Sequence, residues 1–102
     1  MKTRLELHEE LCRLLGSRNV YFQPPESMNI HYPAIVYSLE SPETQNADNR
    51  VYFRFKRYRV LVIAKDPEFE LGDSLQNYFS YCRPERPYPS DNLNHWPFTL
   101  FY

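Results

Sequence analysis

The segment that most constrains the fold is residues 50–63, RVYFRFKRYRVLVI, which contain neither glycine nor proline. Aromatic and β-branched residues in such a run favour a pleated, half-buried surface, so we expect a long strand inside a sheet. Apolar side chains alternate in one phase over residues 51–55 and in the opposite phase over residues 58–62. We therefore expect a bulge or a break near Lys56 and Arg57, because one extra residue turns every later side chain to the other face.

The N-terminal segment carries the signals of an amphipathic helix that ends near residue 15. Thr3 fits the N-cap position, and Glu6 three residues later completes a capping box. Gly16 supplies the stop, because glycine takes the left-handed conformation at little cost. On the polar face we expect Glu9 and Arg13 to pair at i,i+4 spacing. The apolar stripe consists of Leu5, Leu7, Leu11, Cys12, Leu14 and Leu15.

A second helix is predicted to open at Asp66 and Pro67, since aspartate caps helices well and proline is favoured at the first helical position. Glu68 and Glu70 then suit the positive end of the helix dipole. Gly72, inside this helix, costs ~1 kcal/mol relative to alanine. The apolar stripe of this helix consists of Leu71, Leu75, Tyr78 and Phe79.

Two shorter strands are predicted before the long one. Residues 20–22 are β-prone, and Pro24 and Pro25 must end that strand because they offer no ladder donor. Residues 32–39, YPAIVYSL, are apolar on both faces, as in a central strand covered on two sides. Residues 41–49 are polar and rich in turn formers, which predicts an exposed loop.

The C-terminal part is divided by prolines. We expect strands at residues 86–88 and 98–102, joined by residues 90–94, with the last strand held in the sheet to its end. The chain of 102 residues has the size of one domain, 1–102, and its 42% hydrophobic and 25% charged content is typical of a soluble globular protein. The predicted fold class is α+β, with two helices packed on a mainly antiparallel or mixed sheet in the order α-β-β-β-α-β-β.

Composition excludes several functional classes. With only two glycines, no glycine-rich phosphate loop can form, and a net charge of −1 gives no field that recruits nucleic acid or a membrane. The sequence has neither an apolar signal-peptide core nor a membrane-spanning stretch. Two cysteines, Cys12 and Cys82, are expected to stay reduced in a chain made in the cytoplasm.

No residue pattern predicts catalysis or metal binding. His8 and Cys12 share a helix face, but two ligands are not a site, and no further ligands stand at metal-binding spacing. Arg83 and Arg86 could lower the pKa of Cys82, yet nothing in the sequence links that thiol to His95. We therefore expect no enzyme activity, no metal and no cofactor.

One local feature stands out, because residues 50–59 hold five cations, four aromatic residues and no anion. Cations interleaved with rings are typical of single-stranded nucleic-acid grooves, where they meet phosphates and stack on bases. The same pattern also describes an amphipathic strand with a cationic outer face that pairs with acids across a subunit contact. Both interpretations stay open for the cations Arg50, Arg54, Lys56, Arg57 and Arg59. The candidate acidic partners are Glu40, Glu43, Glu68 and Glu70.

Several segments together resemble a family of tailed-phage structural proteins. They are GSRNVYFQPPES, YPAIVYSL, YRVLVIAKDPE and CRPERPYPSDNLNHWPFTLFY, and residues 16–25, 65–67 and 91–95 carry most weight. The family comprises tail-completion or tail-terminator proteins of siphoviruses and prophages, also described as minor capsid or minor tail proteins. The resemblance covers residues 7–102. Residues 78–81 and Trp96 depart from it, which leaves the position within the neck open.

The resemblance implies a tail-terminator-like fold and a structural role without enzyme activity. Copies would close into a ring, commonly a hexamer, that completes or caps the tail tube and joins it to the head connector. The implied partners are other copies of the chain and the tail-tube and neck proteins, with DNA able to pass through the lumen, and the implied location is the virion tail or neck. A head-to-tail ring needs two different complementary patches on each subunit. The alternative function is a small nucleic-acid-binding module that uses residues 50–59.

Overall fold

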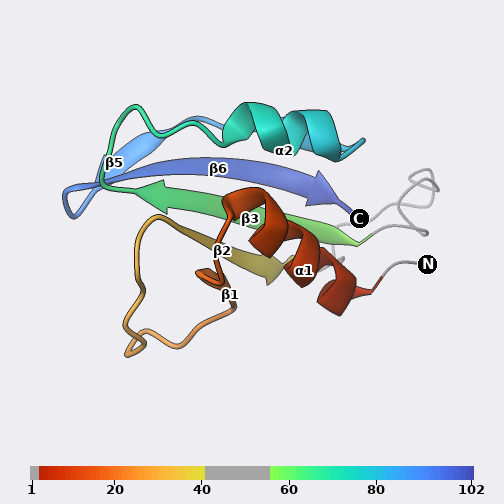
Figure 1. The fold of residues 1–102 in the computed structure, drawn as a ribbon, viewed down its shortest axis with the longest axis horizontal. Helices are drawn as coiled ribbons and strands as arrows, with labels where there is room; N and C mark the ends of the chain where they lie inside the picture. The colour runs from red at the N-terminus through yellow and green to blue at the C-terminus, as the bar shows by residue number, and fades with distance from the viewer. Residues whose placement is uncertain (1–2, 41–55) are drawn as a thin grey trace.

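The computed structural model describes residues 3–40 and 56–102. Two helices and a six-stranded mixed sheet follow one another in the order α-β-β-β-α-β-β-β, which confirms the predicted α+β class and adds one strand. The sheet order is β1-β2-β3-β6-β4, and β5 pairs with β6 beyond the end of β4. Among the strands of the described residues, β1 and β2 are the one parallel pair. In Figure 1, α1 crosses in front of β2 and β3, and α2 lies along β6.

The first helix, α1 (Arg4–Leu15), forms as its sequence predicts. Thr3 and Glu6 make the reciprocal capping box, and Gly16 ends the helix at φ 84° while its N–H bonds to the Cys12 carbonyl. The polar face differs from expectation, because Glu9 pairs with Arg18 rather than with Arg13. The Arg18 side chain comes from the turn after the helix and offers two parallel N–H donors, a better match to a carboxylate than one contact along the helix.

The second helix, α2 (Gly72–Tyr78), begins later than predicted. Asp66 instead closes a turn, in which its carboxylate accepts from the Glu68 N–H and its carbonyl accepts from the Phe69 N–H. As a result Glu68 and Glu70 lie ahead of the helix rather than in its first turn. The predicted apolar stripe is buried except for Tyr78, which is exposed.

Strands β1 (Val20–Phe22), β2 (Ala34–Leu39) and β3 (Arg57–Ala64) agree with three of the predictions. Backbone pairing is regular from Lys56 to Ala64, so no bulge interrupts the described part of the long strand, and residues 41–55 lie outside the described part. Both helices pack on one face of the sheet, so the predicted cover of β2 on two sides is only partial, although Ala34 on the other face is buried. Val36 and Ser38, on its other face, are only half-buried.

The C-terminal region contains β4 (Cys82–Pro84), β5 (Tyr88–Ser90) and β6 (Leu93–Phe101). β4 was not predicted, and β6 is longer than expected because Asp91 and Asn92, both at positive φ, make a two-residue hairpin turn. Pro97 sits inside β6 without breaking it. Its carbonyl accepts from the Glu85 N–H, so its missing donor faces the gap between β4 and β5 and leaves the ladder with β3 intact.

The core lies between the sheet and the two helices. Tyr58, Val60 and Val62 of the central strand β3 are each 1% exposed and face the helices, as their alternation predicts. Tyr102 extends the sheet by exchanging two backbone hydrogen bonds with Lys56, and its ring meets Phe79 edge-on. Its hydroxyl donates to the Glu10 carboxylate, which ties the C-terminal residue to α1. The prediction that the last residues are held in the sheet is confirmed.

Candidate functional site

The sheet face turned away from the helices is the candidate site, and we call it the open face. Strand register places alternate residues of each strand on it, opposite in phase to the core residues. No described residue of α1 or α2 packs there. The open face consists of Tyr21, Ala34, Val36, Ser38, Arg57, Arg59, Leu61, Ile63, Arg83, Tyr88, Ser90, Leu93, His95, Pro97, Thr99 and Phe101, of which Ala34, Ile63 and Pro97 are buried.

Apolar side chains form the middle of the open face. Val36, Leu61 and Pro97 are register neighbours on β2, β3 and β6, and Val36 and Leu61 are half-buried. The connection after β1 reaches this face at one margin, where the Tyr21 hydroxyl accepts from the His31 N–H. Pro97 is buried, so the partly exposed side chains of Val36 and Leu61 are the part of this row that another protein surface can contact.

Arginines flank this apolar row, and two of the three have carboxylate partners. Arg57 lies 3.8 Å from the Glu40 carboxylate. Arg83 lies 3.4 Å from the Glu85 carboxylate, which also accepts from the Thr99 hydroxyl at 3.1 Å. The sequence analysis did not predict this cluster of Arg83, Glu85 and Thr99. The i,i+2 spacing of Arg83 and Glu85 would have indicated it if β4 had been recognised as a strand.

The residues predicted for a subunit or nucleic-acid contact are only partly brought together. Arg50 and Arg54 lie outside the described residues, as does Glu43. Arg57 and Arg59 share the open face, whereas exposed Lys56 follows the phase of the helix-facing residues. Glu68 and Glu70 lie beyond the other end of β3, so the structure separates these two acids from the candidate cations, whereas Glu40 pairs with Arg57 within one copy.

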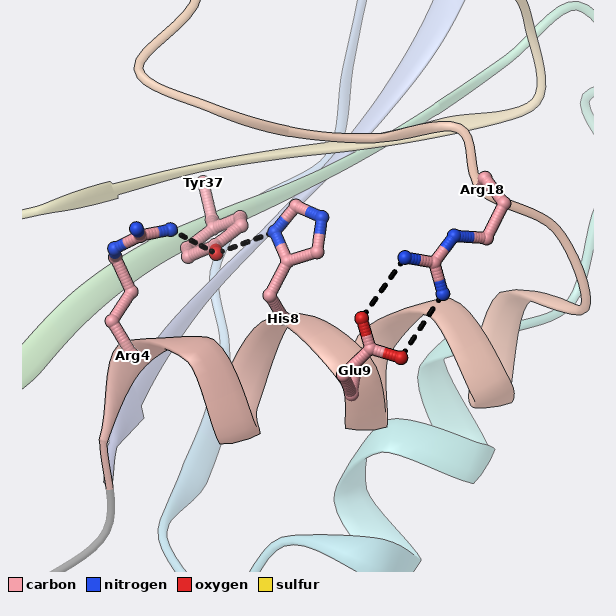
Figure 2. A network of polar contacts seen from close by, with 5 residues as sticks. All are labelled: Arg4, His8, Glu9, Arg18 and Tyr37. Atoms are coloured by element: carbon pink, nitrogen blue, oxygen red, sulfur yellow. Dashed lines mark hydrogen bonds and ion pairs between the residues drawn. The ribbon is translucent and has the colours of Figure 1, made fainter.

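A separate polar network fastens α1 to the sheet (Figure 2). The Tyr37 hydroxyl lies 2.8 Å from His8 Nδ1 and accepts from Arg4 at 3.4 Å. The Arg4 guanidinium also stands 4.3 Å above the Phe22 ring. A neutral His8 accepts the Tyr37 proton at Nδ1, which leaves the hydroxyl oxygen free for Arg4. The network satisfies the one polar atom of a tyrosine that is otherwise buried in the core.

Burial, followed by the charges of Arg4 and Arg18, lowers the pKa of His8 below its ordinary value of 6.5, while Glu9 opposes this. As pH falls below about 6.5, His8 binds a proton more readily in the unfolded chain than in the folded chain. The free energy of unfolding therefore decreases as the pH is lowered from about 6.5. We expect urea unfolding to show a midpoint that decreases between pH 7 and pH 5. The variant His8→Gln should flatten that part of the profile, and an unchanged slope would contradict the assignment. Arg18 lowers the pKa of Glu9, so the stability that this ion pair contributes is lost only below about pH 4.5.

The two cysteines are free in the structure. Burial raises the pKa of Cys82 to about 11, so Arg83 and Arg86 do not activate this thiol as the sequence allowed. Burial also raises the pKa of Cys12. Both are therefore protonated thiols near neutral pH, which is unfavourable for nucleophilic attack.

The described residues contain no group of three histidine, cysteine or acidic side chains that could hold a metal ion. Within residues 3–40 and 56–102, neither helix is long and apolar enough to cross a membrane. Comparison with protein-family models, with curated proteins and with solved structures gives no match. Function is therefore argued from the open face itself.

Proposed function

We propose that this chain is a non-enzymatic structural subunit of the head–tail junction of a tailed phage. Copies would form a ring of tail-terminator type that completes or caps the tail tube and joins it to the head connector. The observation that carries the proposal is the open face, a sheet surface with an aliphatic row and charged side chains on which neither of the described helices packs. The sequence resemblance at residues 16–25, 65–67 and 91–95 supports the same role.

The sheet edges favour association through faces rather than through added strands. On β4, the backbone groups of Tyr81 and Glu85 bond to β6, so the backbone groups of Cys82 and Pro84 face the sheet edge, and Pro84 has no N–H to offer. On the other side, β1 has three residues and is followed by Pro24 and Pro25. Short, proline-blocked edges are poor templates for another strand. Subunit contacts would then be made by side chains, including those of the open face.

The first test is the mass of the purified protein across a concentration series, with negative-stain imaging of any large species. Closed rings are the expected result. The variant Leu61→Glu places an unpaired carboxylate in the aliphatic row. We therefore expect the protein concentration at which half of the chains are assembled to rise at least about tenfold. Leu5→Glu is the matched control, because Leu5 is 66% exposed on α1 and lies outside the open face.

Two results would contradict the proposal. One is a chain that remains monomeric throughout and also fails to bind tail-tube or neck proteins. The other is assembly that tolerates Leu61→Glu as well as it tolerates Leu5→Glu. Salt-sensitive retention of a monomer on single-stranded DNA would instead favour the nucleic-acid module.

A further inference from the structure

Among the described residues of the open face, Arg59 is the cation without an ion pair. The face also holds Arg57 and Arg83, and each of these has a carboxylate within 4 Å. Arg59 is exposed, projects from the central strand β3, and has no carboxylate partner in the part of the chain that the structure describes. An exposed arginine beside an aliphatic row has the composition of an interface anchor.

The backbone that carries Arg59 is held firmly. Its neighbours along the strand, Tyr58 and Val60, are each 1% exposed in the core. Its register neighbours on β2 and β6 are Ser38 and Thr99, two short hydroxyl side chains that leave the guanidinium accessible. A cation on such a rigid platform loses little backbone freedom when it meets a partner.

The complementary charges lie elsewhere on the same molecule. Residues 66–73, here called the acidic segment, carry Asp66, Glu68, Glu70 and Asp73, all exposed and none in an ion pair with a described residue. Arg59 and Ala64 are five residues apart on β3, which is about 17 Å, and the acidic segment begins beyond Ala64. Its later part leads into α2 on the opposite face of the sheet (Figure 1). Arg59 therefore cannot reach these carboxylates within one copy.

From this charge complementarity we infer that Arg59 docks on the acidic segment of a second copy of this chain. The two surfaces differ and lie on different parts of the subunit, so the contact is heterologous and propagates head to tail into a ring or a filament. With a net charge of −1, like-charge repulsion between whole copies is small. The inference rests on the proposed ring-forming function and names one of its subunit contacts.

The test is charge reversal, read by sedimentation equilibrium and negative stain at two salt concentrations. Arg59→Glu is expected to weaken self-association, raising its dissociation constant Kd about tenfold or more, because interfacial charge pairs couple strongly. Arg13→Glu is the control, because it makes the same charge change on exposed α1, away from the open face. The triple variant Arg59→Glu, Glu68→Arg, Glu70→Arg restores the opposite charges and should recover association.

The outcomes separate this inference from the proposed function. If the wild type forms rings and Arg59→Glu forms them equally well, the Arg59 contact is wrong while the proposed ring-forming function stands. A wild-type chain that is monomeric up to millimolar concentration would overturn both. If the triple variant stays dissociated while Arg59→Glu alone loses single-stranded DNA binding, the partner of Arg59 is a phosphate backbone and not a second copy.

Discussion

Replacing Tyr37 with alanine should lower the free energy of unfolding by about 3–5 kcal/mol, because it removes a large ring from the core. Tyr37 is 1% exposed, and the centroid of its ring lies 5.0 Å from that of Phe22 and 6.0 Å from that of Tyr58. A loss of this size is a large fraction of the stability of a domain of 102 residues. Urea unfolding followed by circular dichroism measures it.

Tyr37→Phe is the matched variant, since it keeps the ring and removes only the hydroxyl. The contacts to His8 and Arg4 disappear, and we expect a cost of about 1 kcal/mol. Equal losses in the two variants would mean that the polar network, and not ring packing, carries the contribution of this residue. A loss below about 1 kcal/mol in Tyr37→Ala would contradict the packing described for β2.

Replacing Gly72 with valine should destabilise the protein by about 1–3 kcal/mol through overpacking. A Cβ atom at this position would stand 3.1 Å from Cζ of Phe98, a residue that is buried on β6 and has little room to move. Ser74→Val is the control, because Ser74 is exposed in the same helix and pays the β-branching cost alone. The difference in thermal midpoint between the two variants reports the clash.

The outcome at Gly72 also distinguishes two explanations for the residue. If glycine were only a weak helix former there, Gly72→Ala would stabilise the helix and Gly72→Val would be nearly neutral. If close approach to Phe98 requires glycine, both substitutions lose stability, and Val more than Ala. Stabilisation by both substitutions would contradict the placement of α2 against β6.

Local interactions explain why α1 was predictable. The capping box joins Thr3 to Glu6 and the stop at Gly16 bonds to Cys12, so these signals act within three or four residues and do not depend on the rest of the fold. The helix-facing phase of β3 was equally readable, because its alternation must match a sheet with one buried face.

The start of α2 could not be read in the same way. Asp66 and Pro67 are good helix openers, but the Asp66 carboxylate is used in a turn instead. The helix begins where Leu71 and Leu75 can both be buried against the sheet, and that position depends on residues far along the chain. Tertiary burial outweighed a local capping preference worth about 1 kcal/mol.

For the candidate site, the sequence by itself determined which charged residues the chain has, that they cluster at residues 50–59 and 66–73, and that the central strand has one core-facing phase. Only the tertiary structure decided that Arg57 on β3 meets Glu40 at the end of β2, that the Glu85 carboxylate beside Arg83 also bonds to Thr99 on β6, and that Arg59 has no ion pair with a described residue. It also decided that both helices cover the same face. Side-chain alternation specifies that a strand has two faces, whereas the path of the connections chooses which face the helices bury.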